Sequence, residues 1–175
     1  MSIRMMSPLA ARVAQVLKDY LPTELALIDA EEADSLTTPV IESAAYYEWD
    51  TKYIARYPAC SIRTVSSTPF EILSDGFGRR IDADHRMDVM FHLTQGQTNA
   101  DPLRLQKFMH RYIAGAARVL CVMYEALQTS ADPTRYAEIV TWTEAATYGP
   151  EQEQDDGTLV RTATLPISVR RREAR

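Results

Sequence analysis

The sequence predicts a single α+β domain over residues 1–175, with a four-stranded mixed or antiparallel sheet covered on one face by a long helix, and amino-terminal helices. Three observations support this prediction. Two segments of strand-like composition precede a long segment with helical spacing. Two further strand-like segments follow it, and strands adjacent in sequence tend to pair. The length is sufficient for one domain with a real core, but not comfortably for two.

Helical patterns open the chain. Ser7 and Pro8 are typical of a helix start, with the serine as the capping residue and the proline in the first turn. Apolar residues then recur at helical spacing as far as Tyr20. Pro22 would interrupt the hydrogen-bond ladder of a continuous helix, so we expect a second helix to begin there. A loop is expected over residues 35–39.

An aromatic segment lies between residues 40 and 57. Its members Tyr46, Trp49, Tyr53 and Tyr57 have the spacing of one face of a helix. A stripe of this kind is typical of a core or of a subunit interface.

Two strands are predicted in the middle of the chain. Residues 59–73 are rich in β-branched side chains, and Pro69 is expected to limit the end of this strand. Residues 86–94 alternate between apolar and polar side chains. The apolar set expected to point one way is Met87, Val89, Phe91 and Leu93.

The strongest helical signal begins at Asp101-Pro102, which again pairs a capping residue with a first-turn proline. A broad apolar face follows, and we expect the helix to end near Thr129. Gly115, Ala116 and Ala117 form a narrow waist at which a neighbouring element can approach closely.

The last two strands, over residues 137–148 and 158–172, predict a hairpin. Its connection, residues 149–157, is acidic and longer than a tight turn requires, and such loops are either mobile or used for contact. The residues expected on the core face of the final strand are Leu159, Ala163, Leu165, Ile167 and Val169. The same strand ends in the basic run Arg170, Arg171 and Arg172.

Composition argues against several classes of protein. The formal net charge of −5 opposes broad non-specific binding to nucleic acid. Cys60 and Cys121 are too few for a disulfide framework and are expected to be buried, reduced thiols. No apolar run approaches a membrane span, and no signal-peptide pattern is recognised. We therefore expect a soluble protein made in the cytoplasm, without membrane association.

Recognised motifs for catalysis are lacking in the sequence, so we expect no enzyme and no catalytic, cofactor or metal site. The densest ionisable group is Asp82, Asp84, His85 and Asp88, whose carboxylates and imidazole could bind a divalent cation. A solvated start to the predicted strand explains these residues more simply. A small metal-dependent hydrolase that uses the four residues is kept as an alternative.

Five stretches and their order along the chain resemble one protein family. They are the first helix leading into Leu21–Leu25 and Ile28–Glu32, the Tyr57–Ile62 start of the first strand, the His85–Thr94 strand, the long helix, and the hairpin ending in Thr162–Arg170. In this order they resemble the tail terminator and tail completion (neck) proteins of long-tailed bacteriophages. These stretches together span most of the chain.

The resemblance implies a structural virion protein that caps the phage tail tube and joins tail to head as a ring, commonly a homohexamer. Its implied partners are further copies of itself, the tail tube protein and the head-tail connector protein. DNA passes through such a ring without specific binding. The implied site of action is the virion neck, after assembly in the host cytoplasm. Another connector or adaptor component of the neck fits the same resemblance.

Contacts with neighbouring subunits are expected in the aromatic stripe, the acidic connection and the basic end. The residues are Tyr46, Trp49, Tyr53, Glu151, Glu153, Asp155, Asp156, Arg170, Arg171 and Arg172. A cytoplasmic binding module, dimeric through the aromatic stripe, is a third interpretation.

Overall fold

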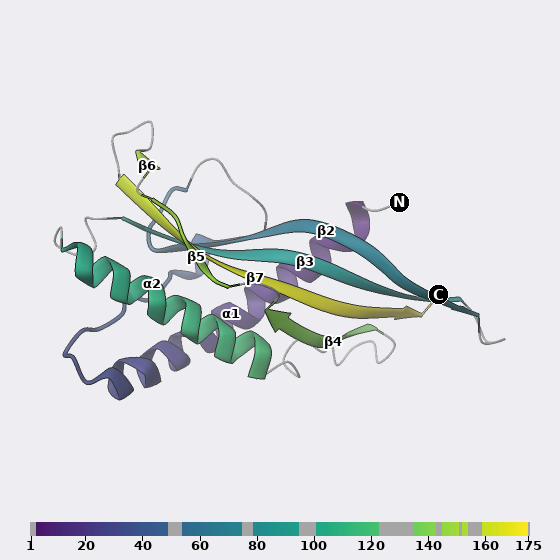
Figure 1. Cartoon of the computed structure of the whole chain (residues 1–175), viewed down its shortest axis with the longest axis horizontal. Coiled ribbons are helices and arrows are strands. Elements are labelled where there is room, and N and C mark those ends of the chain that lie inside the picture. The colour runs from purple at the N-terminus through teal and green to yellow at the C-terminus, as the bar shows by residue number, and fades with distance from the viewer. Residues whose placement is uncertain are drawn as a thin grey trace.

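A computed structural model describes most of the chain. The described ranges are 3–48, 54–74, 79–94, 101–122, 135–142, 145–150, 152–153 and 159–174. They form a mixed sheet with two long helices packed on one face (Figure 1). The predicted α+β class is therefore confirmed. Among the described helices, none has the length and apolar character needed to cross a bilayer.

Four long strands and one short strand form the path of the sheet, in the order β1-β2-β3-β7-β4. Their bounds are Tyr46–Tyr47 for β1, Ala59–Ser74 for β2, Arg79–Thr94 for β3, Leu159–Ala174 for β7 and Arg135–Trp142 for β4. All long neighbours are antiparallel, whereas β1 runs parallel to β2 and makes the sheet mixed. The four predicted strands are thus present, and β1 is an addition to them.

The predicted closing hairpin is confirmed, because β4 pairs with β7 in antiparallel register. Two short segments, β5 (Thr147–Tyr148) and β6 (Gln152–Glu153), pair with β7 further along. Part of the acidic connection therefore belongs to the sheet. The β3 strand begins at Arg79, seven residues before the predicted start at residue 86.

The amino-terminal helices predicted on either side of Pro22 are one helix, α1 (Ile3–Glu32). Proline inside a helix costs about 3 kcal/mol, because it removes a hydrogen bond and crowds the preceding turn. Leu21 and Leu25 flank it and are almost fully buried, which contributes about 2 kcal/mol each. Packing of the continuous apolar stripe therefore offsets the local cost, and the predicted break is wrong.

The second long helix, α2 (Pro102–Ala117), begins as predicted, with the side chain of Asp101 accepting a hydrogen bond from the Leu103 N–H at 3.0 Å. It continues as a π-helical turn, η3 (Arg118–Val122). The expected end near Thr129 lies outside the described residues. The predicted waist is confirmed: a Cβ added to Gly115 would lie 2.9 Å from Leu21 Cδ1. The neighbour that approaches there is α1.

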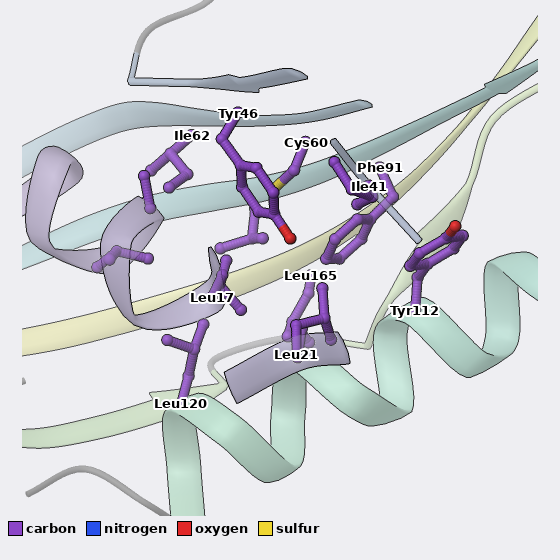
Figure 2. Close-up of a cluster of buried hydrophobic side chains, with 14 of the residues drawn as sticks. Leu17, Leu21, Ile41, Tyr46, Cys60, Ile62, Phe91, Tyr112, Leu120 and Leu165 are labelled. Carbon is purple, nitrogen blue, oxygen red and sulfur yellow. The ribbon is translucent and has the colours of Figure 1, made fainter. Parts of the chain in front are cut away.

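The aromatic stripe is not a helix where the structure describes it. After a short 3-10 turn, η1 (Ser43–Ala45), Tyr46 and Tyr47 form β1 and pair with Cys60 and Ser61. The ring of Tyr46 lies in the core beside Cys60 (Figure 2). Pairing with the sheet edge and burial of this ring override the helical spacing of the sequence.

The core lies between the sheet and the helices (Figure 2). Phe91 of β3 stacks on Tyr112 of α2, with ring centroids 5.3 Å apart. The predicted core rows of β3 and β7 are buried, with the exception of Leu159, which is 36% exposed. The prediction for Leu159 is wrong because the last pair between β3 and β7 is Thr94 with Val160. Leu159 lies one position beyond that pair, so β3 does not cover it.

Candidate contact surfaces

The predicted contact residues fall into different environments. Tyr46 is buried within its own chain, and Arg170, Arg171 and Arg172 lie within β7. Glu153 belongs to β6 and pairs with Leu159. The remaining five lie outside the described residues: Trp49, Tyr53, Glu151, Asp155 and Asp156.

The long strands extend past both helices at one end of the molecule (Figure 1). We call this part the sheet arm. By strand register we define it as residues 68–74 of β2, 79–84 of β3, 135–137 of β4 and 170–174 of β7, which pair with one another. Because a sheet buries its apolar positions against another layer, an extension beyond the helices is a candidate contact surface.

Charge distinguishes the sheet arm from the rest of the chain. It carries six arginines and four acidic residues, a net charge of +2, which leaves −7 on the remainder of a chain whose total is −5. The register places Asp82 opposite Arg172 and Asp84 opposite Arg170. The tip, where β2 and β3 are joined, carries Arg79 and Arg80. The arm is therefore a basic extension on an acidic body.

A polar network lies on the sheet face opposite the helices. His92 contacts the Ser61 hydroxyl through Nε2 at 2.8 Å and the Thr162 hydroxyl through Nδ1 at 3.1 Å. Ser61 is only 1% exposed. A buried serine beside a histidine suggests nucleophilic chemistry, but a substrate has no direct access to this hydroxyl. Hydroxyl groups can donate or accept, so the network accounts for both imidazole nitrogens and joins β2, β3 and β7.

Two residues of the hypothesised metal site, His85 and Asp88, lie on opposite faces of β3. Successive side chains of β3 point to opposite faces. His85 is buried on the core face, where its Nδ1 lies 2.7 Å from the Ser67 hydroxyl. Asp88 lies on the other face and is paired with Arg63. Within the described part of the chain, no group of three His, Cys, Asp or Glu side chains is arranged to hold a metal ion.

A buried ion network joins the end of α1 to α2. The Arg111 guanidinium, 4% exposed, donates to Asp29 at 2.8 Å, to Asp34 at 2.6 Å and to the Leu36 carbonyl at 3.1 Å. Hydrogen bonds from Lys107 and then Arg111 hold the pKa of Asp34 well below its usual range. The network fixes the connection that follows α1 against α2.

Sequence reasoning missed Arg111. A signal was present, because Arg111 lies three residues after Phe108 and four before Gly115, which places it on the buried side of α2. A cation at such a position requires buried partners. Asp29 in the last turn of α1 and Asp34 just after the helix provide them.

An open groove lies between the last turns of α1 and the length of α2 from Leu103 to Ala114, with a volume of about 460 Å³. Ile28, Leu103 and Ala114 contribute apolar walls, and Glu32, Lys107 and Arg111 contribute charged ones. Leu103 is 62% exposed. His110, which also lines the groove, stacks on Tyr148 of β5, with ring centroids 4.5 Å apart. The groove is a second candidate contact surface.

Neither protein-family models nor curated proteins give a match to this sequence. The case for function therefore depends on the residues and on their arrangement.

Proposed function

We propose that this protein is a structural subunit of a bacteriophage virion, a tail terminator or a closely related neck component. It caps the tail tube and joins the tail to the head as a ring of subunits, without catalysis. The observation that carries the proposal is the sheet arm, which extends beyond the helical layer. In an assembly, neighbouring subunits supply the layer that the chain does not place there.

The order of elements supports the same proposal. A long first helix, a long hairpin, a second helix and a closing hairpin follow one another, as the resemblance implies for this family. The long strands provide an extended platform, about 50 Å for each 16-residue strand at 3.3 Å per residue.

The face of the sheet opposite the helices suits the passage of DNA. Its charged side chains balance along β2 and β3, since Arg63 and Arg86 accompany Asp84 and Asp88. Hydroxyl groups such as Thr162 and Ser168 lie further across on β7. A surface of balanced charge does not hold phosphate groups strongly, so the genome can slide past it. We assign this face to the lumen of the ring.

Light scattering and co-sedimentation with phage tail tubes test the proposal. We expect the purified chain to have the mass of a closed oligomer, six subunits for the commonest ring, and to sediment with tubes in an amount set by the number of tube ends. Tubes of two lengths at equal total mass provide the control, because binding to ends follows the number of tubes. A monomeric chain that fails to bind tubes would contradict the proposal.

A further inference from the structure

A single stretch of chain closes one side of the core. Residues 33–47, which we call the strap, lead from the end of α1 past α2 to β1 at the edge of the sheet. The buried residues of the strap are Thr38, Ile41, Ala45 and Tyr46. Figure 2 shows Ile41 and Tyr46 close to Cys60 of β2, whose side chain is fully buried. The strap therefore covers Cys60 at this edge.

Side chains, rather than backbone pairing, hold the strap in place. The carboxylate of Asp29 accepts hydrogen bonds from the Thr38 N–H at 2.7 Å and from the Thr38 hydroxyl at 2.6 Å. Arg111 and Tyr112 of α2 donate to two backbone carbonyls of the strap. Across the described parts of the chain, residues 34–44 form no backbone-to-backbone hydrogen bond with a helix or a strand. Detachment of the strap would therefore break the short pairing of β1 and leave α1, α2 and the four long strands paired as they are.

The start of the strap is strained. Ala33 has φ 49° and Ser35 has φ 62°, in the left-handed region that is unfavourable for residues with a Cβ. Asp34 lies between them, and its ion pairs with Lys107 at 2.8 Å and with Arg111 at 2.6 Å hold this conformation. Opening of the strap relieves the strain and so lowers the free energy that opening requires.

We infer that the strap opens as one unit while the rest of the fold stays intact, and that opening uncovers Cys60 and the adjoining edge of β2. Segments that few backbone hydrogen bonds join to the scaffold open at a lower free energy than the whole protein. The inference concerns the conformation of a single chain and does not depend on the proposed role in the tail.

The strap covers the part of the β2 edge that is best suited to pairing. The register of β2 against β3 is regular over Ala59–Thr64 and shifts twice further along, the second time directly after Pro69. Bulges and proline oppose the addition of another strand to an edge. Cys60 and Ser61, the partners of β1, lie within the regular part. The closed strap thus protects an edge that, once uncovered, can accept a strand from another chain.

Reaction of Cys60 with a disulfide reagent such as DTNB measures the opening. Cys121→Ala leaves Cys60 as the only thiol of the chain. Burial raises the pKa of the Cys60 thiol, so the closed form does not react. While the rate stays proportional to reagent concentration, it reports the fraction of open molecules. We expect this rate to rise with urea much less steeply than global unfolding followed by circular dichroism, because opening exposes little surface.

Three variants of the Cys121→Ala chain separate opening from global unfolding. Thr38→Val removes the hydroxyl that donates to Asp29 and should speed labelling about tenfold. Ala33→Gly relieves strain at the start of the strap and should slow labelling about two- to fivefold. The control is Val169→Ala, at a fully buried position of β7 well along the sheet from β1. It should lower the urea midpoint and leave the labelling rate in the absence of urea unchanged.

The inference is overturned if labelling of Cys60 follows the full urea dependence of global unfolding. An unchanged labelling rate in Thr38→Val also overturns it, as does a Val169→Ala chain whose labelling speeds up as much as its fold is weakened. Circular dichroism identifies a variant that fails to fold, and the urea dependence of the parent chain and the rate in Ala33→Gly then decide the outcome.

Discussion

Replacing Arg111 tests the buried ion network. In Arg111→Met a hydrocarbon chain replaces a guanidinium that makes two charged hydrogen bonds and one to a backbone carbonyl. Removal of one partner from a buried charge pair costs about 3–5 kcal/mol. Asp29 and Asp34 are 15% and 19% exposed and keep Thr38 and Lys107 as partners. We therefore expect the lower end, a loss of about 3 kcal/mol in the free energy of unfolding.

Urea denaturation followed by circular dichroism measures this loss as a shift in midpoint at unchanged slope. The matched control is Arg118→Met, which removes an equally well-formed pair with Glu31, at 3.0 and 2.7 Å. Both side chains of that pair are largely exposed, at 42% and 57%, so little change is expected. Equal losses in the two variants, or a loss below about 1 kcal/mol for Arg111→Met, would refute the reasoning from burial.

Three further predictions concern the same helices. Folding stabilises the ionised form of Asp34, so its contribution to the free energy of unfolding is complete above the unfolded pKa of about 3.9 and declines below it. In Asp34→Asn the urea midpoint should therefore fall less between pH 6 and pH 3 than in the wild type. An unchanged dependence of the midpoint on pH would contradict this. Ala33, the residue after the end of α1, has φ 49°, so Ala33→Gly should raise the free energy of unfolding by about 0.5–1 kcal/mol, and a lower melting temperature would contradict this. Gly115→Leu should cost at least about 2 kcal/mol through overpacking against Leu21, whereas Ala114→Leu on the exposed side should be nearly neutral, and equal effects would contradict the close approach.

Local patterns in the sequence predicted those elements in which local and tertiary preferences agree. The alternation of residues 86–94 predicts a strand whose Met87, Val89, Phe91 and Leu93 are buried, and this is confirmed. The capping role of Asp101 and the close approach at Gly115 are also confirmed. In each case the feature depends on a few neighbouring residues.

Sequence patterns were insufficient where distant partners decide the structure. Pro22 favours a helix break, but the burial of Leu21 and Leu25 carries α1 through it. Tyr46 has helical spacing with later aromatics, yet its backbone pairs with Cys60. The groove and the sheet arm could not be predicted either, because they arise from the way α1 crosses α2 and from the length of the sheet beyond both helices.

Electron microscopy of tail tubes incubated with the purified chain tests the central claim most directly. The account predicts a ring at the tube end, with the rotational symmetry of the tube. Bare tube ends with the wild-type chain, or decoration along the tube walls instead of the ends, would contradict the proposed role in the tail.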